Sequence, residues 1–177
     1  MRRAILLIFL GVLFLTVQTT LLAFLPIRRI RPDLVLILTL YLGLFHPPVS
    51  GGILTVFIGF LTDLFSGNSF GLYTLSRPVI FYVAQFFRER FYLESVTSQF
   101  LFVFIFGLGE GILLFILLNV LNPDPLGDFY LLLFTFLLPQ SFFTGLITPI
   151  VFFLIHKASF PFFGQHEAEL IERRDRS

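Results

Sequence analysis

The two longest apolar runs of this chain limit its fold more than any other feature. They cover residues 95–121 and 129–155, and together they contain a single charged residue. About 20 apolar residues in an α-helix suffice to cross a hydrocarbon core of about 30 Å. The runs therefore predict two membrane-spanning helices. The composition agrees, because only 13% of the residues are charged, whereas about 25% is usual in soluble domains.

Four further apolar runs precede these two, so we expect an all-α integral membrane protein with a bundle of six transmembrane helices. They cover residues 4–25, 34–45, 51–65 and 72–87. The first is longer than the roughly 7–15 apolar residues of a signal peptide, so we expect it to be retained. The second and third are short, which fits either half-spans or short helices inside a bundle. We place the six-span domain at residues 1–157 and a short polar cytoplasmic tail at 158–177.

The distribution of basic residues predicts the orientation of the chain. With six spans, both termini lie on one side of the membrane, and that side receives eight lysines and arginines against four on the other. Because basic residues are enriched in cytoplasmic loops, we expect both termini in the cytoplasm. The first loop, with Arg28, Arg29 and Arg31, opposes this assignment. We expect the acidic turn at residues 122–128 on the outer side.

Charged residues inside the apolar runs are the candidate polar sites. Asp63 lies near the end of the third run, and Arg77 lies at a similar depth in the fourth. Since charges within membranes commonly pair, we predict an Asp63–Arg77 ion pair; the alternative is that Asp63 belongs to an ion or substrate site. Glu110 lies near the middle of the fifth run, level with Gln140 of the sixth. We predict either a Glu110–Gln140 hydrogen bond or a contact between Glu110 and a partner protein.

Small residues form two helical faces that could pack closely against another helix. Gly51, Thr55 and Gly59 recur at intervals of four, and Gly107 and Gly111 form a Gly-x-x-x-Gly pattern. Small residues let helix backbones approach each other closely in lipid. Both faces are therefore candidate docking surfaces for a partner.

The sequence gives no support for catalysis, a metal or a cofactor. It contains no cysteine, and His46, His156 and His166 lack the spacing of a metal site. No nucleophile motif or phosphate-binding glycine loop occurs. A net charge of +1 gives no reason to expect a nucleic-acid partner. We expect a non-enzymatic protein that lies in the lipid bilayer.

A stretch in the first half of the chain resembles the family of the rod shape-determining protein MreD. The resemblance begins at Arg31-Pro32-Asp33-Leu34 and continues over residues 59–76 as Gly-Phe-x-x-Asp-Leu-x-Ser-Gly-x-x-x-Gly-x-x-x-Leu-Ser. The residues that match the family motif are Pro32, Asp33, Gly59, Phe60, Asp63, Gly67 and Gly71. The length and the map of apolar runs are also similar, and Glu110 matches an acid that the fifth run of family members can carry.

The resemblance implies a non-enzymatic component of the bacterial cell-elongation (rod) complex in the cytoplasmic membrane. It implies binding to the scaffold protein MreC and work alongside RodA with its penicillin-binding transpeptidase, and with MreB indirectly. It also implies a fold similar to the substrate-binding subunits of energy-coupling-factor vitamin transporters. That similarity leaves an alternative, a small-molecule-binding subunit of a transporter. Such subunits typically have an Ala-x-x-x-Ala face on the first span, whereas the first run here has only Ala4 and Ala23.

Overall fold

The computed structural model describes residues 2–24, 32–66, 71–88, 95–121 and 129–175. Within these ranges, side chains are described except at residues 2–7, 21–24, 129, 156 and 158–175. The described residues are almost all helical and include no β-strand, so the all-α prediction is confirmed. The elements are α1 (Arg2–Phe24), α2 (Leu34–Phe45), α3 (Pro48–Ser66), α4 (Leu72–Phe87), α5 (Val96–Leu121), α6 (Phe129–Leu132), the π-helical turn η1 (Leu133–Leu137) and α7 (Leu138–Asp175).

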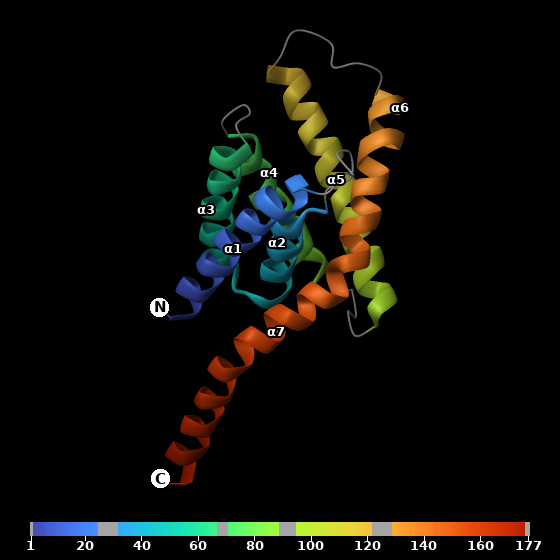
Figure 1. The fold of residues 1–177 in the computed structure, drawn as a ribbon. Coiled ribbons are helices and arrows are strands. Elements are labelled where there is room, and N and C mark those ends of the chain that lie inside the picture. The colour runs from blue at the N-terminus through green and yellow to red at the C-terminus, as the bar shows by residue number, and fades with distance from the viewer. Residues whose placement is uncertain (1, 25–31, 67–70, 89–94, 122–128, 176–177) are drawn as a thin grey trace.

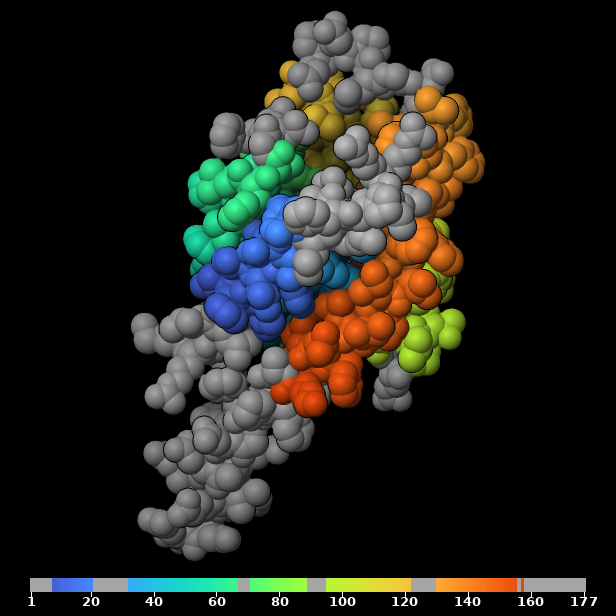
Figure 2. Space-filling model, viewed as in Figure 1, coloured from blue at the N-terminus to red at the C-terminus, as the bar shows by residue number. Residues whose placement is uncertain are grey.

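The short helix α2 lies at the centre of the bundle. Every residue from Val35 to Leu44 is buried, and α2 contacts α1, α3, α4, α5 and α7. On the face shown in Figure 2, α2 is visible only as a narrow strip between α1 and α7. Because protein surrounds this helix, its length need not match the thickness of the bilayer. Burial thus explains why the run is apolar on all sides and yet only 12 residues long.

Helices α3 and α4 form a close antiparallel pair (Figure 1). A Cβ atom on Gly59 would lie only 2.5 Å from the carbonyl oxygen of Tyr73 in α4. A Cβ atom on Gly51 would lie 2.6 Å from the ring of Phe81, also in α4. The small residues of α3 therefore permit a close helix contact, and the neighbouring helix belongs to the same chain.

Helix α5 packs against the continuous helix made of α6, η1 and α7. This helix includes the predicted sixth run and continues past residue 157 to Asp175 without a break. In Figure 1 the last part of α7 projects away from the bundle. The boundary predicted between a membrane domain and a tail thus falls inside one continuous helix.

Three helices of the described part are long and apolar enough to cross a membrane. They are Pro48–Ser66, Val96–Leu121 and Tyr130–Ile155, and shorter apolar helices cover Ile8–Thr20 and Leu34–Phe45. Large apolar side chains on the outer surface are exposed in every one of the long helices, as expected for groups that face lipid. The start of α1 and the end of α7 lie toward one end of the bundle, and the end of α5 and the start of α6 lie toward the other (Figure 1).

Candidate functional site

Arg77 of α4 is the centre of a buried ionic network. Its side chain is 0% exposed. Its Nη2 donates to Oδ2 of Asp33 at 2.6 Å, and its Nη1 donates to Oε2 of Glu110 at 2.9 Å. The guanidinium also lies 5.3 Å from the centroid of the Tyr73 ring, within the range of a cation–π contact. The network therefore links the start of α2 to α4 and α5.

Asp33 has its position because it caps α2. Its Oδ1 accepts a hydrogen bond from the backbone N–H of Leu36 at 2.8 Å, so one of the unpaired amides of the first turn is satisfied. Its own backbone N–H donates to Oγ1 of Thr144 in α7 at 3.0 Å. The hydroxyl of Thr144 in turn donates to the carbonyl of Gln140 at 2.7 Å. Asp33 is thus held between two helices while its second carboxylate oxygen bonds to Arg77.

Asp63 caps the start of α4 and does not pair with Arg77. Its carboxylate accepts hydrogen bonds from the backbone N–H groups of Tyr73 and Thr74, each at 2.9 Å, and from the hydroxyl of Thr74 at 2.6 Å. A carboxylate is stabilised there because the amides at a helix start are unpaired and carry partial positive charge. The predicted Asp63–Arg77 ion pair is therefore wrong, since Asp63 bonds to the start of α4 and Arg77 pairs with Asp33 and Glu110.

Glu110 bonds to α4, and the hydrogen bond predicted to Gln140 is not formed in the described structure. One carboxylate oxygen of Glu110 accepts from Arg77, and the other has a long contact of 3.4 Å from the hydroxyl of Ser76. Glu110 is 3% exposed. Gln140 and Glu110 line the same cavity, which is described below. The charged guanidinium of Arg77 is a stronger partner than a neutral amide for a buried carboxylate.

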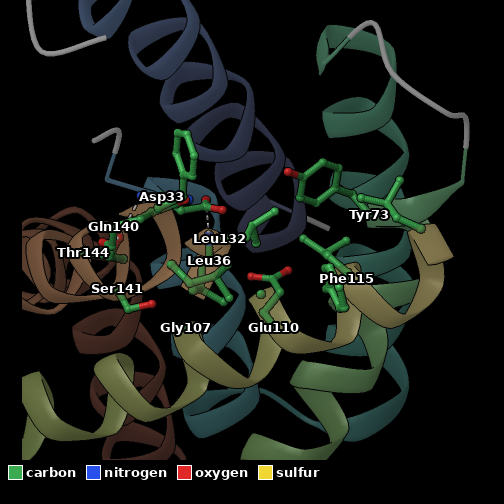
Figure 3. A pocket seen from close by; sticks show the side chains of 15 residues that line it. Asp33, Leu36, Tyr73, Gly107, Glu110, Phe115, Leu132, Gln140, Ser141 and Thr144 are labelled. Atoms are coloured by element: carbon green, nitrogen blue, oxygen red, sulfur yellow. Dashed lines mark hydrogen bonds between the residues drawn. The ribbon is translucent and has the colours of Figure 1, made fainter. Parts of the chain in front are cut away.

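A cavity of about 250 Å³ lies beside the ionic network. Figure 3 shows Glu110 and Gly107 on one side, Gln140, Ser141 and Thr144 on another, and Tyr73 and Phe115 at the far end. Its lining is polar near Asp33 and apolar elsewhere. The lining residues are Asp33, Leu36, Tyr73, Gly107, Glu110, Gly111, Leu114, Phe115, Leu118, Leu132, Phe136, Leu137, Gln140, Ser141 and Thr144.

The small-residue faces lie against helices of the same chain. Gly51 and Gly59 face α4, and Thr55 between them is buried. Gly107 lies against Ser141 of α7, and a Cβ atom on Gly111 would overlap the side chain of Leu137. These glycines thus set the spacing between helices that enclose the network and the cavity.

The remaining motif residues lie around the two helix starts. Pro32 is buried next to Asp33. Phe60 is exposed on the outer surface of α3. Gly71 has a φ of 101°, a conformation that glycine adopts without strain, and α4 begins directly after it. Gly67 lies outside the described residues.

The comparison with known families decides the class of this protein. Residues 1–158 match the family of the rod shape-determining protein MreD. The chain belongs to the MreD family. The match includes the whole network around Arg77, the cap at Asp63 and the cavity. No curated protein and no solved structure matches the chain.

Membership in the MreD family supports a role in determining rod shape. The family is not a known family of enzymes, and the described residues contain no cluster of three or more histidine, cysteine, aspartate or glutamate side chains that could hold a metal. Together with the apolar helices, the family marks this chain as a multi-pass membrane protein.

The sequence alone indicates four polar candidates, Asp63, Arg77, Glu110 and Gln140, whereas Asp33 stands out only as part of the family motif. A local signal for Asp33 was present, because an aspartate directly before an apolar helical run is a preferred N-cap. Nothing local indicated that the same carboxylate also pairs with Arg77, which is 44 positions away.

Proposed function

We propose that this chain is a non-catalytic membrane component of the bacterial cell-elongation complex and acts by recruiting or stabilising MreC and the peptidoglycan synthases. The family match over residues 1–158 is the observation that supports this proposal most strongly. The arrangement of the chain agrees with it, because almost all of the described residues lie in helices that pack on one another. Such a protein acts on its partners mainly through its membrane helices.

The proposal places the chain in the cytoplasmic membrane with six spans and both termini in the cytoplasm. The excess of basic residues on the side of the termini supports this orientation. The six-span fold is proposed to be similar to the substrate-binding subunits of energy-coupling-factor transporters. RodA with its penicillin-binding transpeptidase and, indirectly, MreB are the further proposed partners.

Outward-facing helix surfaces are the proposed contacts with MreC, because α4, α7 and η1 already cover the small-residue faces. Three exposed positions sample different surfaces: Phe86 on α4, Ile112 on α5 and Phe153 on α7. A photo-crosslinking residue is introduced at one position at a time. Positions on the surface that contacts MreC should form an adduct with it, and positions on the other surfaces should not. The scan is then extended to the other exposed positions of α3, α4, α5 and α7. Absence of adducts at all of them would contradict direct contact through the described helices.

Depletion of the chain in its source bacterium tests the proposed function in cells. Rods should become round as the chain is lost, and MreC should co-purify with the tagged chain from membranes before depletion. Re-expression of the unaltered chain should restore the rods. Cells that stay rod-shaped without the chain would reject the cell-elongation role.

The cavity favours a second candidate, a small-molecule-binding subunit of a transporter. Its volume and mixed lining are compatible with a small ligand. Loss of such a subunit should abolish uptake of one solute and leave cell shape unchanged. Uptake and shape, measured in the same depleted cells, therefore separate the two functions.

A further inference from the structure

We propose that the cavity binds a small organic cation, a primary ammonium group attached to a short apolar body. The ammonium group binds beside Glu110, and the apolar body lies along the opposite wall. This inference rests on the cavity and its charges alone, so it does not depend on which partners the chain has in cells.

The charges at the cavity are unbalanced. The carboxylates of Asp33 and Glu110 are both buried and both line the cavity. Among the described residues, Arg77 is the one cation bonded to them, so these three groups carry a formal charge of −1 when all are ionised. A buried excess charge is unfavourable in surroundings of low polarity. A cation in the cavity removes this excess.

Hydrogen-bond acceptors are available on the polar side of the cavity. Oε1 of Glu110 has only the long contact of 3.4 Å from Ser76, and in Figure 3 the carboxylate is directed into the space between α5 and Leu132. Ser141 is 3% exposed, and its side chain with the hydroxyl lines the cavity. In Figure 3 this hydroxyl points toward the cavity. An ammonium group has three donors, and the lining offers the Glu110 carboxylate, the Ser141 hydroxyl and the side-chain carbonyl oxygen of Gln140 as acceptors.

The remaining wall suits an apolar body. Leu114, Phe115, Leu132 and Phe136 line it. The volume of about 250 Å³ corresponds to on the order of eight water molecules at about 30 Å³ each. A small aromatic amine such as 2-phenylethylammonium combines the required charge with an apolar ring. Sites for small molecules are commonly mostly apolar with a few placed polar groups, as here.

Thermal unfolding of the purified full-length chain in detergent tests the proposal. The midpoint is measured, from the loss of monodisperse protein on heating, at increasing concentrations of 2-phenylethylamine at neutral pH. The matched control ligand is 2-phenylethanol, which has the same ring and a neutral hydroxyl. The amine should raise the midpoint and bind at least tenfold more tightly than the alcohol. Equal effects of the two ligands, or no effect of the amine, would overturn the proposal.

Variants of the lining locate the site. Glu110→Gln keeps the size of the side chain and an acceptor for Arg77 but removes the excess charge, so it should weaken amine binding at least tenfold. Ser141→Ala leaves both ion pairs in place and should weaken binding several-fold, which keeps the test valid if the first variant fails to fold. Thr97→Ala, at an exposed position of α5 outside the cavity, should bind as the unaltered chain does. Unchanged binding by both lining variants would refute this site.

The source of the ammonium group is decided in nanodiscs. If the headgroup of phosphatidylethanolamine occupies the cavity, discs that contain this lipid should raise the midpoint and abolish the effect of added amine. If a free amine is the ligand, the effect of the amine should be the same with phosphatidylethanolamine and with phosphatidylglycerol alone. Either result supports an ammonium site. If the amine has no effect in either kind of disc, the ammonium site is contradicted.

Discussion

Arg77 and Asp33 lie 44 positions apart in the sequence, and their side chains meet at 2.6 Å inside the helix bundle. This bond fixes the start of α2 against α4, and the second bond, from Arg77 to Glu110, adds α5. A buried ionic network is not by itself a source of stability, because removing charges from water is costly. Breaking it by removal of one partner is strongly destabilising, since the remaining charges stay buried.

Arg77→Met should therefore destabilise the chain severely. The substitution leaves two buried carboxylates without their cation, which costs about 3–5 kcal/mol. The expected result is a much lower midpoint of thermal unfolding in detergent and a reduced amount of protein in the membrane.

A triple variant provides the control for Arg77→Met. Adding Asp33→Asn and Glu110→Gln removes both unpaired charges, while the asparagine side chain retains an acceptor for the cap of α2. Much of the lost stability should return. A triple variant as unstable as Arg77→Met alone would show that unpaired charge is not the cause.

Asp63→Ala should weaken the start of α4. It removes all three hydrogen bonds to Tyr73 and Thr74 and leaves two backbone amides unpaired, at a cost of about 2 kcal/mol. Asp63→Asn should cost less, because its side chain keeps one acceptor oxygen. Both are measured as shifts of the unfolding midpoint. Rescue of Asp63→Asn by a neutral residue at Arg77 would instead indicate a direct pair.

The helices could be predicted from the sequence because apolar runs and their polar or proline-rich boundaries are local signals. The predicted second run, residues 34–45, has the bounds of α2. The pairing of charges could not be predicted in the same way. Pairing two residues by their depth in the apolar runs assumes that every helix starts at the same level. Helix α2 does not meet that assumption, since Asp33 at its start is buried and reaches Arg77.

The position of Asp63 shows a second limit of sequence reasoning. Its position in the third apolar run predicts an intramembrane carboxylate with a cation as its partner. The structure satisfies the carboxylate with backbone amides at the start of α4 instead. These donors have no sequence signature, because every helix start has them. Which carboxylate meets which helix start depends on the packing of α3 on α4.

Gly59→Ala should destabilise the chain, and Gly109→Ala should not. The new Cβ at Gly59 would lie 2.5 Å from the carbonyl oxygen of Tyr73 and 3.0 Å from Cα of Thr74, so backbone must move. We expect a loss of about 1–3 kcal/mol, as for overpacked cores. A Cβ at Gly109 would meet nothing within 4 Å, and alanine favours a helix by up to about 1 kcal/mol.

The larger variant Gly59→Leu separates packing within the chain from docking of a partner. Because α4 already occupies this face, the variant should fail to accumulate in the membrane. Normal accumulation with specific loss of MreC from the purified complex would show that the face docks a partner.

The ends of α5 should be accessible from opposite sides of the membrane. Its 26 residues extend about 39 Å at about 1.5 Å per residue, which exceeds a hydrocarbon core of about 30 Å. The chain contains no cysteine, so single cysteines introduced at Ser95 and Leu121, both exposed, give labelling without background. In intact cells whose outer membrane, where present, is permeabilised, an impermeant thiol reagent should label Leu121→Cys. It should label Ser95→Cys only after the cytoplasmic membrane is opened. If Ser95→Cys is labelled from outside and Leu121→Cys is protected, the orientation is the reverse of the one proposed. If both are labelled from outside, α5 does not span the membrane.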